Sequence, residues 1–193
     1  MAQTTQPTAI YPKTVLLRDG TEVVLRPLGE DDGGKLLDFF ASIPQEERYY
    51  LQDNVASPEV VRHWTHHPDF ERVIPIVALV DDNIVADGSL HRSPTPSRRH
   101  AGELRVVVHP DYRKRGLGAR VIRELVDTAL DEGLSMVYFR LVVGREDAAI
   151  QAAKGLGFVE AGVLHGAIKD ARGVYLDVVT LELPIVESMW WRY

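Results

Sequence analysis

The stretch that most constrains the fold is residues 103–118, where a short strand, a glycine turn and the start of a helix follow one another. Residues 104–108 are apolar except for Arg105 and end in three consecutive valines, and Pro110 stops this run. Gly116 and Gly118 come next, and an amphipathic run begins directly after them. Free backbone N–H groups and the helix dipole both favour an anion at such a place. The order therefore predicts a loop that binds phosphate.

The two commonest phosphate-binding motifs of nucleotide-binding proteins do not fit this spacing. A dinucleotide fingerprint needs a third glycine, and Val121 stands where it belongs; no Walker A run occurs anywhere in the chain. Arg113, Lys114, Arg115 and Arg120 surround the turn with positive charge. On the residues alone, a tight turn with solvated arginines remains the alternative interpretation.

Composition predicts one ordinary globular domain over residues 1–193, with a flexible start at 1–12 and an aromatic tail at 184–193. The net charge of −6 disfavours nucleic acid as a partner, because phosphate affinity rests on clustered Lys and Arg. The absence of cysteine excludes disulfides, thiolate zinc sites and a Cys nucleophile. No signal peptide and no run of about 18 apolar residues occurs, so we expect a cytoplasmic protein that does not bind a membrane.

Apolar periodicity and turn residues predict the element order of an α/β chain with a mixed sheet rather than a doubly wound one. The strand expected at 136–143 is almost continuously apolar, so we expect it to be covered on both faces near the middle of the sheet. The expected elements are a hairpin at 15–25, helices at 36–43, 45–51 and from 58, a hairpin at 73–90, a strand at 104–108, a helix at 117–130, a strand at 136–143, a helix at 148–154 and a hairpin at 159–183.

Two motifs carry a resemblance to a known family. The run from His109 to Gly118 reads H-P-x-Y-R-x-x-G-x-G and resembles motif A of the GNAT superfamily of acyl-CoA-dependent N-acyltransferases. Residues 149–150 and 156–158, Ala-Ile and Leu-Gly-Phe, resemble the fourth-helix region of that superfamily. The likeness, which covers roughly residues 23–183, implies the GNAT fold. That fold is a mixed, mostly antiparallel twisted sheet of about six to seven strands with helices on both faces, here with an extra N-terminal hairpin.

The resemblance also implies acetyl-CoA as co-substrate and no metal. In the family the glycine loop holds the pyrophosphate through backbone amides, and the preceding strand is splayed from the next one by a bulge and offers main-chain groups to the pantetheine arm. The residues expected to contact the cofactor are therefore Val106, Val107, Val108, Arg113, Lys114, Arg115, Gly116, Leu117, Gly118 and Ala119.

The resemblance specifies the catalytic residues less completely than the cofactor-binding residues. By resemblance, Glu103 is the carboxylate that takes the proton of the amine, directly or through water; an edge glutamate in solvent is the alternative. The tyrosine that serves the family as general acid maps onto Ala153, and a common asparagine is replaced by Glu146. Tyr138 and Tyr175 are substitutes by residue type only.

The acceptor is expected to be a primary amine held between the N-terminal half and the last hairpin. The acidic balance of the chain slightly favours a cationic acceptor. Candidates for the pocket by polarity and position, each of which also has a plain structural explanation, are Trp64, Tyr49, Tyr50, His91 and Asp87.

Three further sequence features are a histidine cluster, an arginine pair and an aromatic tail. His63, His66 and His67 share a helical face, but no acidic ligands accompany them, so an exposed helix end is preferred over a metal site. Arg98 and Arg99 are expected in a surface loop. The tail 189–193 holds three aromatic residues, and we expect it to dock on its own domain or, preferably, in a homodimer.

The leading hypothesis is an N-acetyltransferase that transfers an acetyl group from acetyl-CoA directly to a primary amine of a small molecule or a protein. A regulatory or sensing module that binds CoA without efficient transfer is the alternative, because the usual tyrosine is missing. A nucleic-acid-binding domain that uses Arg98, Arg99 and residues 113–120 is disfavoured by net charge and by the lack of a recognised motif.

Overall fold

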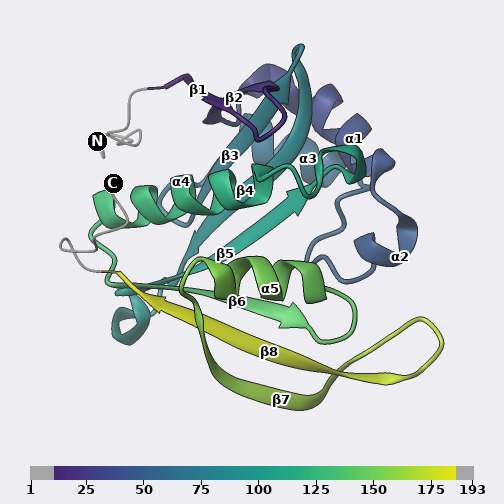
Figure 1. Cartoon of the computed structure of the whole chain (residues 1–193), viewed down its shortest axis with the longest axis vertical. Helices are drawn as coiled ribbons and strands as arrows, with labels where there is room; N and C mark the ends of the chain where they lie inside the picture. The colour runs from purple at the N-terminus through teal and green to yellow at the C-terminus, as the bar shows by residue number, and fades with distance from the viewer. Residues whose placement is uncertain (1–10, 186–193) are drawn as a thin grey trace.

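The computed structural model describes residues 11–185, and its eight strands form one sheet (Figure 1). The strand order is β1-β2-β3-β4-β5-β6-β8-β7, and only the β5–β6 pair is parallel. The strands are β1 (Lys13–Leu16), β2 (Glu22–Pro27), β3 (Val73–Val80), β4 (Asn83–Arg92), β5 (Ala101–Val108), β6 (Met136–Val142), β7 (Val159–Lys169) and β8 (Tyr175–Pro184).

Helices cover both faces of the sheet. In Figure 1, α4 and α5 lie across the near face, and the N-terminal helices lie on the other side of the sheet. The α-helices are α1 (Gly33–Ser42), α2 (Gln45–Arg48), α3 (Pro58–His66), α4 (Leu117–Asp131) and α5 (Asp147–Gly155). Short 3-10 turns are η1 (Glu30–Asp32), η2 (Pro96–Arg98) and η3 (Pro110–Tyr112).

Each face of the sheet has its own hydrophobic cluster. The cluster under α4 and α5 includes Leu104, Val121 and Phe158, and the cluster under α1 and α3 includes Phe40 and Val77. Because strand side chains alternate between faces, neighbouring residues on β4 and β5 belong to different clusters. We call the two sides of the sheet the α4 face and the α1 face.

The predicted element order and the mixed, mostly antiparallel sheet with helices on both faces are confirmed. The sheet has eight strands rather than six or seven, because the N-terminal hairpin joins its edge through the β2–β3 pair. The helix expected at 45–51 is shorter, ending at Arg48. The aromatic tail 189–193 and most of the expected flexible start lie outside the described residues.

The expectation that residues 136–143 form a strand covered on both faces was wrong for one face. Val137, Phe139 and Leu141 are buried on the α4 face, but Tyr138 is only partly buried and Arg140 is exposed on the α1 face. The strand is the sixth of eight, and the N-terminal helices do not close over this part of the sheet. Its α1 face is therefore open to a ligand.

Helix α4 lies close to the sheet at Gly88, which has no side chain. A Cβ atom at Gly88 would stand 2.5 Å from Val121 Cγ1 and 3.2 Å from Leu125 Cδ1, both on α4. The helix ends at Asp131, and Gly133, with a φ angle of +75°, follows its C-cap Glu132 in the expected position. This close packing fixes the start of α4, and hence the glycine turn, relative to β5.

Within residues 11–185, no helix is both long enough and apolar enough to cross a membrane.

We expect Gly88→Ala to lower the free energy of unfolding by about 1–3 kcal/mol, because the added methyl group overpacks the contact between β4 and α4. Gly34→Ala on α1 is the matched control: a Cβ there meets nothing within 4 Å, so its stability should stay equal or rise by up to about 1 kcal/mol. Denaturant unfolding of both variants measures the difference. Equal stability would contradict the tight packing of α4.

Candidate active site

The sheet opens between its two central parallel strands. Strands β5 and β6 pair only from Ala101–Met136 to Glu103–Tyr138, although β5 continues to Val108 and β6 to Val142. Beyond Glu103, β5 remains paired with β4 and β6 remains paired with β8. The edge of residues 104–108 that faces β6 therefore has no strand partner within the described chain, so its main-chain groups can bind an extended ligand, although Val108 O already accepts a bond from Arg113. We call this gap the β5–β6 opening.

The splay expected from the resemblance is present without the expected bulge in β5. The β4–β5 register runs unshifted from Arg92–Gly102 to Ala86–Val108. The register shift that the structure does contain here lies between β3 and β4, at Ala78 and Leu79. The opening results from the end of pairing, not from an extra residue in β5.

The glycine turn lies at the wide end of the opening. Lys114 and Gly116 have left-handed φ angles of 62° and 92°, which turn the chain sharply from η3 into α4. Gly116 is the N-cap and offers no side chain, so the first N–H groups of α4, at residues 117–119, have no partner inside the helix. Arg120 N–H is the first to bond back, to Gly116 O at 3.2 Å. These amides and the helix dipole form a site suited to a phosphate.

The predicted cofactor residues of β5 divide between the two faces. Val106 and Val108 pack against the cluster of the α4 face, whereas Val107 packs against the cluster of the α1 face. A ligand that runs along the α4 side of the opening would meet the first two side chains, and only the main chain of Val107. Leu117 is buried, so it too can contribute only its N–H group.

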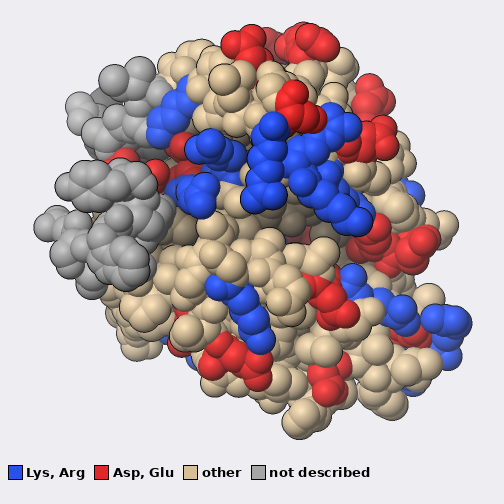
Figure 2. All heavy atoms as spheres, viewed as in Figure 1, with Lys and Arg blue, Asp and Glu red and all other residues tan. Residues whose placement is uncertain are grey.

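Positive charge collects around the turn, as Figure 2 shows for the region over the start of α4. Part of that charge is already paired. Arg113 donates two hydrogen bonds to Glu47 of α2, at 3.0 and 2.6 Å, and a third to Val108 O. Arg115 pairs with Asp19 and lies over the Tyr112 ring. The turn is thus tied to both α2 and the N-terminal hairpin.

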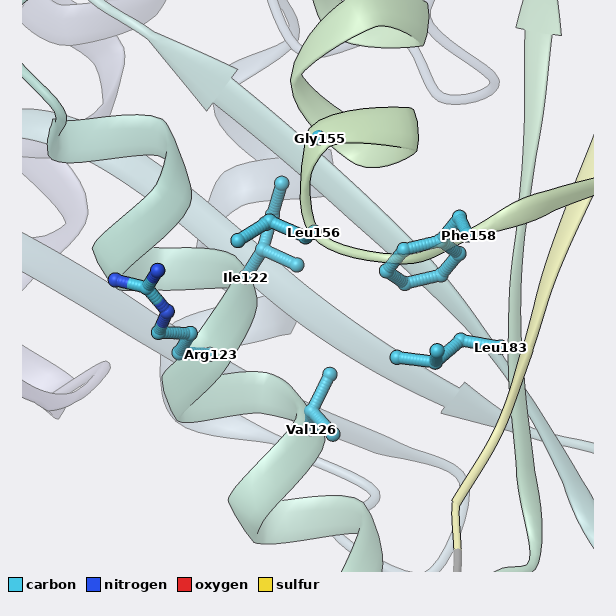
Figure 3. Close-up of a pocket in the computed structure, with 7 residues that line it drawn as sticks. All are labelled: Ile122, Arg123, Val126, Gly155, Leu156, Phe158 and Leu183. Carbon is cyan, nitrogen blue, oxygen red and sulfur yellow. The ribbon is translucent and has the colours of Figure 1, made fainter. Parts of the chain in front are cut away.

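An apolar hollow of about 140 Å³ lies between α4 and the end of α5 (Figure 3). Ile122 and Val126 of α4 face Leu156 and Phe158 across it, while Arg123 extends away from these apolar side chains. The hollow is on the same face of the sheet as the glycine turn. The sequence motif that includes Leu156 and Phe158 therefore serves helix packing and also lines a surface depression.

Glu103 lies at the narrow end of the opening, on the α1 face, with only 6% of its surface exposed. Its carboxylate accepts hydrogen bonds from Gln52 Nε2 at 2.7 Å and from Arg140 Nη2 at 2.8 Å, and Arg105 Nε lies 3.6 Å away. Gln52 Oε1 in turn accepts a bond from Arg105. Sequence reasoning missed Gln52, Arg105 and Arg140, because no local pattern predicts which distant side chains meet a strand residue.

This network keeps Glu103 ionised. Burial alone would raise the pKa of Glu103, but the hydrogen bonds from Arg140 and Gln52 and the charges of Arg105 and Arg140 outweigh it and leave the pKa lowered. A carboxylate in this state is a weak proton acceptor. Arg140 and Arg105 offset its negative charge, but its oxygens have lone pairs left that can accept a hydrogen bond from an ammonium group.

A second carboxylate on the same face has the opposite environment. Asp87 of β4 lies in register between Val77 and Val107, both in the cluster under α1. Burial raises its pKa to about 7, and no neighbouring charge contributes. Two residues further along β4, Ser89 Oγ lies 2.9 Å from His91 Nε2. Burial, followed by the charge of Arg105, lowers the pKa of His91 to about 4, so this imidazole is neutral near pH 7.

The two tyrosines that could replace the missing general acid, Tyr138 and Tyr175, lie in very different parts of the structure. Ala153 is buried in the core and offers no hydroxyl group. Tyr138 lies directly opposite Glu103 across β5–β6, whereas Tyr175 is 67% exposed near the far tip of the β7–β8 hairpin. Burial and then Glu103 raise the pKa of Tyr138, which keeps its hydroxyl protonated. Glu146 accepts a hydrogen bond from Val142 N–H and thereby closes the end of β6.

The other acceptor-pocket candidates are mostly structural. Trp64 packs edge-on against Phe40 in the cluster under α1. Tyr49 packs edge-on against Tyr50 and donates to Lys169 O of the last hairpin at 3.1 Å. Of the five candidates, the structure brings Asp87 and His91 to the face that carries Glu103.

The remaining sequence features lie away from this site. His63 and His66 are exposed on α3, and His67 is its C-cap. No group of three or more side chains suited to hold a metal occurs within the described part of the chain. Arg98 and Arg99 lie in the expected surface loop, at η2.

Comparison with known proteins assigns the fold and its glycine turn to a family. Residues 37–158 match the sequence model of the acetyltransferase (GNAT) family. The chain belongs to the GNAT acetyltransferase family. It is thus an acyltransferase, and the family uses acetyl-CoA.

Individual acetyltransferases are similar along most of this chain. An acetyltransferase of Pseudomonas aeruginosa is 28% identical over 151 residues, which cover 74% of this chain and 78% of that protein. A GNAT acetyltransferase structure from Streptococcus pneumoniae superposes with a TM-score of 0.75 at 20% identity, covering 84% of this chain and 99% of that one. A Salmonella typhimurium structure that contains its cofactor acetyl-CoA gives a TM-score of 0.72 at 18% identity, covering 86% and 96%.

We expect Asp87→Asn to stabilise the protein at high pH only. The folded state holds the Asp87 proton up to about pH 7, whereas an unfolded aspartate loses it near pH 4, so wild-type stability falls as the pH rises between these values. The variant lacks this loss and should be more stable by about 2–4 kcal/mol above pH 8, with no gain below pH 4.

Urea unfolding at a series of pH values measures this difference. Asp38→Asn, at an exposed position on α1, is the matched control and should follow the wild type throughout. A constant difference between Asp87→Asn and the wild type at every pH would contradict the raised pKa.

Proposed function

We propose that this GNAT enzyme transfers an acetyl group from acetyl-CoA directly to a primary amine of a small molecule or a protein. The observation that carries the proposal is the β5–β6 opening, with a glycine turn at its wide end and an ionised carboxylate at its narrow end. A phosphate-bearing donor fits the first feature, and an ammonium-bearing acceptor fits the second.

On the donor side, the N–H groups of Leu117, Gly118 and Ala119 would bind the pyrophosphate. The free edge of residues 104–108 would bind the pantetheine arm as an added strand would, through main-chain hydrogen bonds. The side chains of Val106 and Val108 would line its path. Arg113, Lys114 and Arg115 would add positive charge around the phosphates.

On the acceptor side, Glu103 would accept a hydrogen bond from the ammonium group and orient it towards the thioester. Tyr138, opposite Glu103, is the hydroxyl group we assign to protonate the leaving thiolate. The family resemblance implies that Glu103 also takes the proton of the amine; this stays a prediction, and the lowered pKa of Glu103 and its bond from Arg140 weigh against it. The single domain over residues 1–193, the cytoplasmic location and the homodimer also stay predictions.

The test of the proposed function is the release of free thiol from acetyl-CoA across a panel of amines. The panel contains polyamines, amino acids, aminosugars and peptides with a free N-terminus or a lysine. Thiol release that depends on one class of amine, with the acetylated product identified by mass spectrometry, is the expected result. No release above the rate without amine, across the whole panel, would overturn the proposal.

We expect Gly116→Val and Gly118→Leu to weaken acetyl-CoA binding on the order of 100-fold or more, because each blocks the approach of phosphate to two or three N–H groups. Gly133→Val is the matched control: Gly133 also has a left-handed φ angle, but it lies at the other end of α4. Titration calorimetry with acetyl-CoA should show normal binding for this control, provided that the variant folds. Unchanged binding by Gly118→Leu would contradict the assignment of the turn.

A further inference from the structure

Asp87 is an unusual residue for its place in the sheet. It lies in the middle of β4, with Val77 of β3 on one side and Val107 of β5 on the other. Both valines belong to the hydrophobic cluster that Phe39 and Phe40 of α1 complete. A carboxylate in such surroundings lowers the stability of the fold unless a partner compensates for the lost water.

Asp87 has no such partner. Its carboxylate makes no hydrogen bond and no ion pair with any residue in the range 11–185, and it is only partly buried, so water or a ligand can reach it. The contrast with Glu103 is direct, because Glu103 accepts bonds from Gln52 and Arg140 and lies near Arg105. The cost of an unpaired carboxylate is most simply explained by a function that needs it.

The position of Asp87 connects it to the reaction. Its neighbour across the strands is Val107 of β5, the strand that borders the β5–β6 opening. Ser89 and His91 continue the same side of β4, and His91 lies opposite Glu103. A row of polar groups thus runs along the α1 face from Glu103 to Asp87, on the side from which the acceptor would enter.

Burial is the influence that raises the pKa of Asp87, and the causes of this shift include none of the charged groups on the surrounding elements. They are His91 on β4, Glu103 and Arg105 on β5, Asp53 before α3, and Lys35 and Asp38 on α1. Of these, Arg105 is bonded to Asp53, and Lys35 is bonded to Asp82.

We propose that Asp87 is the proton acceptor of the transfer reaction, reached from the amine through water, while Glu103 remains an anion that holds the ammonium group. The inference rests on the proposed function. It assigns the two tasks of the acceptor side, proton transfer and ammonium binding, to two different carboxylates. Two carboxylates whose surroundings differ in this way commonly take different roles in one active site. A group that gains and loses a proton near neutral pH is the better exchanger.

The proton balance of this step is complete. The ammonium group gives one proton through water to an Asp87 oxygen, and the neutral amine attacks the thioester carbonyl. The C–N bond forms and the C–S bond breaks. The Tyr138 hydroxyl protonates the thiolate sulfur and regains its proton from the second amine proton, so that acetyl-CoA and the ammonium yield amide, free CoA and one proton. Asp87 then releases that proton to solvent.

The test compares the pH dependence of kcat/KM for the wild type, Asp87→Asn and Glu103→Gln. It uses the amine from the panel with the highest turnover and a fluorinated analogue whose amine is less basic. Each rise or fall (limb) of the plot of kcat/KM against pH is set by the pKa of one titrating group. A limb set by an enzyme group has the same midpoint pH with both amines, whereas a limb set by the amine shifts with the pKa of the amine. Asp38→Asn serves as the matched control for loss of one carboxylate on the α1 side.

We expect the wild type to show an enzyme limb rising through about pH 7. Asp87→Asn should lose this limb, and kcat/KM at pH 8 should fall about 100-fold or more with acetyl-CoA binding unchanged. Glu103→Gln should keep the limb and raise KM for the amine. Urea unfolding shows whether each variant is folded, independently of activity.

Three results would overturn the inference. An enzyme limb that survives in Asp87→Asn would remove Asp87 from proton transfer, and a limb lost only in Glu103→Gln would assign the role to Glu103; both leave the proposed function intact. Absence of thiol release by the wild type with every amine would overturn the proposed function itself, and this inference with it.

Discussion

The structure depends on the way in which two parallel strands, β5 and β6, are held apart. Each keeps an antiparallel partner on its outer side, β4 for β5 and β8 for β6, so their divergence after Glu103 costs little pairing elsewhere. Helix α4 connects them and is fixed against the sheet by close contact at Gly88. The opening is therefore a permanent feature of the sheet, and a ligand that supplies the missing strand contacts finds them already arranged.

Two carboxylates on the α1 face differ in which protonation state their surroundings favour, and the sequence pattern does not reveal this difference. Glu103 and Asp87 are both strand carboxylates next to apolar residues, yet the first has guanidinium and amide donors and the second has valines on both sides. Donors hold the first as an anion, and burial favours the neutral form of the second. The difference arises from Gln52 and Arg140, which lie 51 and 37 residues from Glu103 in the chain.

Local patterns were sufficient to predict most of the fold and the position of the glycine turn before α4. Apolar alternation and turn residues determine the hairpins, and the glycine turn depends only on residues close in sequence, so both were predictable. The same reasoning failed for β6, because Tyr138 and Arg140 interrupt an apolar run whose second face lies open. It also missed the partners of Glu103, since contacts between distant segments leave no periodic signal. The polar alternation of Asp87, Ser89 and His91 was visible, but its meaning required knowledge of which face they share.

The alternation along β4 and β5 has a practical consequence for engineering. Gly88 and Leu104 serve the packing of α4, whereas their immediate neighbours Asp87 and Arg105 point to the other side of the sheet. One pair of strands thus carries two independent sets of positions, one that packs against α4 and one that faces the proposed acceptor side. If the proposed function holds, libraries that vary only the second set should change acceptor preference without altering the packing of α4.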